Sequence, residues 1–174
     1  MIGGKVGGII IESKDVRGTN IKELKRFRLC VNGKEVGVSF YFSGRDYYSP
    51  WLEIDYSPWL REEGIEDQFF LFVYNFLPPG SKLFVTYLND KETSEMLYNG
   101  FHPADTPLGF SILKAGFTWF KDWYYPEGGN EGAPKIQANK PLNMEEGLRQ
   151  LRRLLNEVKK EEVRNFILNK LSQG

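Results

Sequence analysis

Short β-branched and alternating hydrophobic segments in the first third of the chain predict strands. They are expected at residues 6–11, 27–31, 36–42 and 51–56. Asn32-Gly33 lies between the second and third of these segments, and this dipeptide favours a tight hairpin because both turn residues take positive φ. Residues 20–28 fit either a short helix or the lead-in to that hairpin. The N-terminal part of the chain is therefore expected to be antiparallel sheet.

Predicted helices and predicted strands then alternate through the middle of the chain. Apolar residues spaced as on a helix predict a helix over 60–77, which Pro78-Pro79-Gly80 ends. Further helices are expected over 89–98 and 106–116, where Asn89 with Glu92 and Thr106 with Pro107 form start signals. Strands are expected at 83–88, 117–125 and 135–138.

The C-terminal part of the pattern is an amphipathic helix. Asn143 and Glu146 have capping-box spacing, and leucines recur from Leu148 to Leu171, which predicts one long helix. Its charged face is interpreted as solvated, with a partner or nucleic-acid role as the alternative. The fold class is therefore α/β (α+β): a single mixed sheet flanked by helices in residues 1–142, with a helix over 143–174 packed on the same domain.

Composition narrows the function classes. Lys plus Arg number 23 and Asp plus Glu number 23, and this zero net charge argues against general nucleic-acid binding. Cys30 is the only cysteine and is expected to be a small buried hydrophobe, so no disulfide framework exists. No apolar run is long enough to span a bilayer and no signal peptide is evident, so a cytoplasmic protein without a membrane partner is expected. A small-molecule ligand and a second copy of the chain are the remaining partner classes.

The predicted order of antiparallel strands followed by strand, helix, strand, helix and strand resembles the GNAT acyltransferase fold. Lys114-Ala115-Gly116-Phe117 looks like the Gly-Phe ending of a helix in that family, and Asn99-Gly100-Phe101 is a second candidate. The resemblance implies that the 51–56 and 83–88 strands are parallel neighbours near the middle of the sheet. The segment Trp119–Pro141 also resembles a small, mainly archaeal family of uncharacterised proteins that we associate with the GNAT group.

The cofactor that this resemblance implies is a CoA ester. GNAT proteins hold its pyrophosphate on a glycine-rich turn at a helix start, where amides and the helix dipole face the phosphates. Here the corresponding segment, Ser57–Gly64, has one late glycine, a proline without an amide donor, and the carboxylates of Glu62 and Glu63. The sequence therefore predicts weak acetyl-CoA binding or none.

Carboxylates on the 51–56 strand are the candidate catalytic groups. Glu53 and Asp55 are two residues apart, so they share one face of the strand. A carboxylate there could act as general base toward an amine, as GNAT relatives often arrange; the alternative is two solvated rim residues. His102 with Asp105 is a second arrangement for a base, against a surface histidine. A single histidine excludes His-rich metal sites, and we expect no metal.

The stretch from Trp119 to Pro141 is the candidate ligand site, because an aromatic run leads there into a glycine-rich acidic bend and two lysines. We expect the polar groups to converge on a cavity floored by Trp123 or Tyr124. The alternative is an acidic connector after an edge strand, with the aromatic residues in the core. The candidate ligand-binding residues are Trp123, Tyr124, Glu127, Gly128, Gly129, Asn130, Glu131, Lys135, Gln137 and Lys140.

Three functions fit these features. The first is a divergent acyltransferase-like protein that binds or acylates a small ligand, with Glu53 or Asp55 as base. The second is a non-catalytic module that binds a small molecule or a protein. The third is an RNA-associated protein that uses the basic helix face and exposed aromatic rings.

Overall fold

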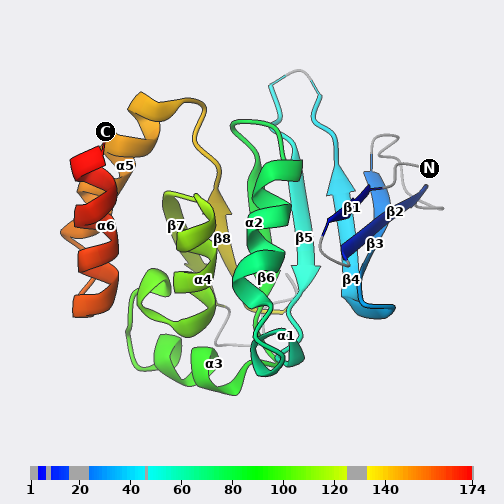
Figure 1. Cartoon of the computed structure of the whole chain (residues 1–174), viewed down its shortest axis with the longest axis horizontal. Helices are drawn as coiled ribbons and strands as arrows, with labels where there is room; N and C mark the ends of the chain where they lie inside the picture. Colours follow the sequence, from blue (N-terminus) through cyan, green and yellow to red (C-terminus); the bar gives the residue numbers. More distant parts are fainter. Residues whose placement is uncertain (1–3, 7–8, 16–23, 46, 125–132, 174) are drawn as a thin grey trace.

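A computed structural model describes residues 4–6, 9–15, 24–45, 47–124 and 133–173. Eight strands form one mixed sheet in the order β1-β2-β3-β4-β5-β6-β8-β7 (Figure 1). The strands are β1 (Gly4–Val6), β2 (Ile9–Asp15), β3 (Leu24–Val31), β4 (Lys34–Phe42), β5 (Trp51–Asp55), β6 (Lys82–Thr86), β7 (Trp119–Trp123) and β8 (Lys135–Asn139). The predicted fold class is confirmed.

The strands at 51–56 and 83–88 are parallel neighbours, as expected. β5 and β6 pair in parallel with Leu52 opposite Leu83 and Ile54 opposite Val85. Every other pair in the described sheet is antiparallel. β8 follows β7 in the chain but lies between β6 and β7. The carboxyl ends of β5, β6 and β7 therefore lie at the same edge of the sheet.

The helices are α1 (Trp59–Glu62), α2 (Glu66–Phe76), α3 (Lys91–Tyr98), a 3-10 turn (Pro103–Asp105), α4 (Pro107–Ala115), α5 (Met144–Leu155) and α6 (Glu161–Gln173). In Figure 1, α2 and α4 lie over β5–β8, and α5 and α6 lie at the far end from β1 and β2. The buried side chains of Leu52, Leu83 and Ile136 point to these helices and join one core. Since side chains alternate along a strand, Trp51, Glu53 and Phe84 lie on the opposite face.

Several local signals act as the sequence predicts. Asn32 and Gly33 have φ of 52° and 81°, which is the hairpin geometry expected of Asn-Gly. The Thr106 hydroxyl accepts from Gly109 N at 3.0 Å, and Asn143 Oδ1 accepts from Glu146 N at 2.9 Å. Both residues are therefore helix N-caps.

Two predicted helices are each broken in two. The 60–77 helix divides at Gly64, whose φ of 72° cannot continue a right-handed helix. The C-terminal helix divides between Leu155 and Glu161, because the buried carboxylate of Asp105 accepts from Lys159 N at 2.9 Å and Lys160 N at 3.1 Å. A single unbroken C-terminal helix is therefore the wrong prediction for this segment.

Helix α3 and the first strand also differ from expectation. The N-cap of α3 is Asp90, one residue after the predicted Asn89. Its carboxylate accepts hydrogen bonds from Arg61 and Thr93. The single strand expected at 6–11 is two strands, β1 and β2, and residues 24–28 belong to β3. No helix in the described part of the chain has the length and apolar character needed to cross a bilayer.

Candidate functional site

A small cavity of about 210 Å³ lies at the edge of the sheet where β6 and β7 end. Tyr87 follows β6, Tyr124 follows β7, and α3 closes the remaining side. This edge is where ligands of open α/β sheets usually bind. We call this cavity the carboxyl-end pocket; its lining residues are Tyr87, Ser94, Glu95, Tyr98, Asn99 and Tyr124.

The inner wall of the pocket holds the buried Tyr87, which is paired with the half-buried Asp122. Tyr87 is 1 % exposed, and its hydroxyl donates to Asp122 Oδ1 at 2.7 Å. Burial raises the pKa of the Asp122 carboxyl, although the Tyr87 hydrogen bond opposes that shift. Burial and the neighbouring Asp122 raise the pKa of Tyr87 still more strongly. The phenol thus keeps its proton and donates a hydrogen bond to the carboxylate of Asp122.

The outer wall of the pocket is more exposed. Tyr98 on α3 is 77 % exposed and Tyr124 is 46 % exposed, so each ring has one side available to a ligand. Glu95 lies one turn before Tyr98 and pairs with Lys91 at 4.0 Å across an exposed helix face. The pocket therefore combines aromatic walls with a few fixed polar groups, as small-molecule sites do.

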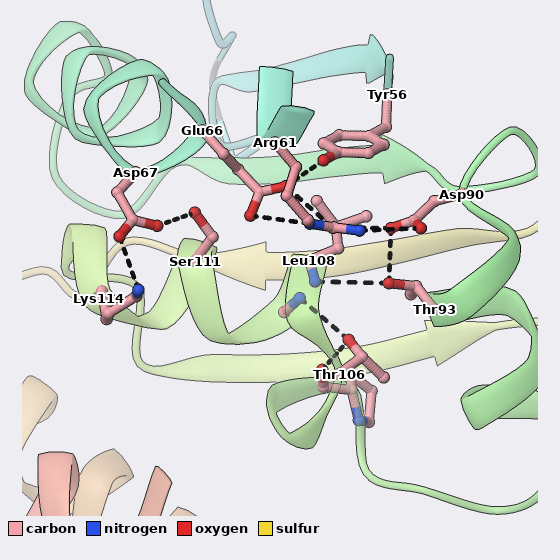
Figure 2. A network of polar contacts seen from close by, with 12 residues as sticks. Tyr56, Arg61, Glu66, Asp67, Asp90, Thr93, Thr106, Leu108, Ser111 and Lys114 are labelled. Carbon is pink, nitrogen blue, oxygen red and sulfur yellow. Dashed lines mark hydrogen bonds and ion pairs between the residues drawn. The ribbon is translucent and has the colours of Figure 1, made fainter. Parts of the chain in front are cut away.

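A polar network holds the start of α3, the helix that closes one side of the pocket (Figure 2). Arg61 donates to both oxygens of Asp90, at 3.1 and 2.9 Å, and pairs with Glu66 Oε2 at 2.9 Å. Tyr56 donates to the same Glu66 carboxylate, and the Thr93 hydroxyl donates to Asp90 Oδ2 at 2.6 Å. Because Asp90 and Thr93 form the start of α3, the network holds the helix that carries Ser94, Glu95 and Tyr98.

The same network reaches two further helices. Leu108 N at the start of α4 donates to the Thr93 hydroxyl at 3.4 Å. Glu66 opens α2, and burial raises the pKa of its carboxyl while Tyr56 and Arg61 oppose that shift. Asp67, the next residue in the first turn of α2, accepts from Ser111 and Lys114 of α4, each at 2.6 Å. Polar contacts thus join α1, α2, α3 and α4.

Five of the predicted site residues come together, but on the opposite face of the sheet. Lys135 Nζ contacts Glu53 Oε1 at 3.1 Å, and Trp123 Nε1 donates to Gln137 Oε1 at 2.9 Å. Asp55 lies on the same face and accepts from Thr86 at 2.5 Å. The two candidate bases therefore contact partners within their own sheet.

The remaining predicted ligand residues are separated. Tyr124 lines the carboxyl-end pocket, whereas Lys140 lies at the other edge of the sheet and donates to the carbonyls of Tyr74 and Leu77, at 2.8 and 2.7 Å. Lys140 thereby caps α2, and desolvation lowers its pKa. It also borders an open groove of about 540 Å³ beside the start of α5. Glu127, Gly128, Gly129, Asn130 and Glu131 lie outside the described residues.

His102 acts as a structural residue. Its Nδ1 accepts from Ala104 N at 3.1 Å at the start of the 3-10 turn, and its Nε2 lies 3.0 Å from Glu157. Asp105 points away to the α5–α6 junction. Within the described residues, no group of three or more His, Cys, Asp and Glu side chains is arranged to hold a metal ion.

Sequence reasoning missed Tyr87, Asp122 and the pocket residues of α3. One signal was available: Asp122 alternates with Lys121 and Trp123, so it shares a strand face with Phe120, and the structure places Phe120 in the core. A carboxylate on the core side of a strand needs a partner. That the partner is Tyr87, 35 residues earlier, could not be read from the local pattern.

The fold and this site define a class: a mixed α/β domain with one sheet, a parallel β5–β6 pair and a small pocket at the carboxyl ends of its strands. The model of the family described as "Protein of unknown function (DUF1122)" matches residues 7–169. The chain belongs to this family. The prediction of an uncharacterised family is thus confirmed, while its archaeal distribution and its GNAT likeness stay predictions.

One similar solved structure is a protein of unknown function, AQ1966, from Aquifex aeolicus VF5. It is 32 % identical to this chain, with a TM-score of 0.69, and the match covers 98 % of this chain and 93 % of that one. No curated protein matches the chain.

Proposed function

We propose that this chain is a small-ligand-binding domain of acyltransferase-like architecture, and that its ligand occupies the carboxyl-end pocket. The observation that carries the proposal is that Tyr87, buried on the wall of a cavity at the carboxyl ends of β6 and β7, is hydrogen-bonded to the half-buried carboxylate of Asp122. Pockets with this combination of aromatic wall and perturbed acid are the default binding sites of α/β folds. The volume of about 210 Å³ suits a small ligand or the head group of a larger one.

Binding without acyl transfer fits the residues better than catalysis. Glu53 is paired with Lys135 and Asp55 with Thr86, which gives both candidate bases a role in holding the sheet. At the start of α1, Leu60 N and Arg61 N donate to the carbonyls of Ser57 and Pro58. These amides are occupied, so they cannot hold a pyrophosphate, and a CoA ester is not the ligand that we expect.

A thermal-shift screen tests the proposal, because a ligand that binds only the folded chain raises its melting temperature. The library contains small cations, anions, neutral fragments, nucleotides and CoA esters. A fragment at 100 times its Kd stabilises the chain by about 2.7 kcal/mol. For a chain of this length that corresponds to roughly 5–11 °C.

Two tyrosine variants locate the binding. Tyr98→Ala removes an exposed pocket wall, and Tyr47→Ala removes a fully exposed tyrosine in the β4–β5 connection. We expect at least one fragment to stabilise the wild type and Tyr47→Ala but not Tyr98→Ala. If every fragment that shifts the wild type also shifts Tyr98→Ala, or if none shifts the wild type, the pocket is not the ligand site.

A further inference from the structure

The aromatic character of the carboxyl-end pocket points to the charge of its ligand. Three of its six described lining residues are tyrosines. Tyr87 directly follows β6, Tyr98 is on α3 and Tyr124 directly follows β7. The face of an aromatic ring carries negative electrostatic potential, which attracts organic cations. Rings that approach one cavity from three separate elements can contact several sides of one head group.

The charged groups around the pocket have the same sign. Glu95 is part of the lining, and Asp122 is joined to the wall through the Tyr87 hydroxyl. None of the six described lining residues is Lys, Arg or His. Lys91, the basic partner of Glu95, is 89 % exposed against 65 % for Glu95, and it does not line the cavity. An anion in this cavity would approach these carboxylates, and none of the six described lining residues would offer it a positive charge.

We infer that the carboxyl-end pocket binds a small organic ammonium ion, held by the rings of Tyr87, Tyr98 and Tyr124 and by the charge of Asp122 and Glu95. The inference rests on the proposed function, since it names the ligand class of the same site. The Tyr87 ring forms the inner wall, and its hydroxyl is occupied by Asp122, so its contact with a ligand is through the ring. The exposed rings of Tyr98 and Tyr124 form the sides through which a ligand enters.

Titration calorimetry with matched probes tests the charge. Choline is compared with 3,3-dimethyl-1-butanol, which has the same shape without the charge, and butylammonium is compared with 1-butanol. We expect at least one of the two cations to bind about 10-fold more tightly than its uncharged analogue, because the ring faces and carboxylates reward only the charge.

Three variants then assign the contacts. Tyr98→Phe keeps the ring and should bind the cation within about 2-fold of the wild type, whereas Tyr98→Leu should lose about 10-fold. Asp122→Asn keeps an acceptor for Tyr87 but removes the charge, and should weaken binding several-fold. Tyr47→Ala is the matched control and should bind as the wild type does.

The outcomes separate this inference from the proposed function. Equal binding of a cation and its uncharged analogue, or equal binding by Tyr98→Leu and the wild type, overturns the ammonium inference. If neither cation binds, but another fragment binds the wild type and not Tyr98→Ala, the ammonium inference is wrong and the proposed function stands. If no fragment at all binds in a Tyr98-dependent way, both are wrong.

Discussion

Arg61 of α1 connects the starts of α2 and α3, and its removal should be costly. Its guanidinium spans Asp90 and Glu66, whose side chains are only 3 % and 10 % exposed. Arg61→Met leaves both carboxylates buried without their cation. Breaking a buried ion pair at one partner costs about 3–5 kcal/mol. Because the Arg61 side chain is itself 30 % exposed, we expect the lower end of that range, about 3 kcal/mol.

Urea unfolding followed by circular dichroism measures this loss of stability. In thermal unfolding, the same loss lowers the melting temperature of a chain of this size by about 6–12 °C. Arg152→Met, on an exposed face of α5, is the matched control and should change stability by less than about 0.5 kcal/mol. The triple variant Arg61→Met, Glu66→Gln, Asp90→Asn removes the stranded charges and should recover at least half of the loss. A cost below about 1 kcal/mol for Arg61→Met, or a triple variant less stable than the single one, would refute this account of the network.

Two further predictions concern single groups. The raised pKa of Asp122 means that the folded chain binds its proton more tightly than the unfolded chain, so this carboxyl stabilises the fold fully below its ordinary value of 3.8 and less as pH rises through the raised pKa. The stability of the wild type relative to Asp122→Asn should therefore fall as pH rises above 3.8 in urea titrations, and a rise would contradict the assignment. Gly109→Ala would place a Cβ 1.8 Å from the Pro103 carbonyl oxygen and should cost about 3 kcal/mol of stability. Gly147→Ala is the control: its nearest contact is at 3.2 Å, and it should change stability by less than about 1 kcal/mol. Equal unfolding midpoints for the two variants would show that the 3-10 turn can move aside.

Local signals predicted the fold well because each of them acts within a few residues. The Asn32-Gly33 turn, the Thr106 cap and the Asn143 cap need only their own segment. The helix break after Leu155 depends instead on Asp105, about fifty residues earlier in the chain, which binds the amides of Lys159 and Lys160. Hydrophobic spacing continues through that break, so the pattern alone indicates one helix.

The candidate site was predicted less well for the same reason. Tyr124 lies at the end of the aromatic run and lines the carboxyl-end pocket. Lys135 contacts Glu53, a pair that was not predicted from the sequence. The pairing of Tyr87 with Asp122 requires β6 and β7 to be placed on either side of β8, which no local spacing encodes. The face of the sheet on which each polar residue lies decided which of them share a site.

The position of β8 has a consequence for synthesis of the chain. Translation delivers β7 before β8, yet among the described strands β7 pairs only with β8, through Trp119–Trp123 against Lys135–Asn139. Until Lys135–Asn139 has emerged, the edge of β6 and all of β7 lack the backbone partners that they have in the finished sheet. Unpaired strand edges promote association between chains. A chain truncated before residue 135 thus has two such edges, one of them aromatic, and should aggregate where the full chain does not.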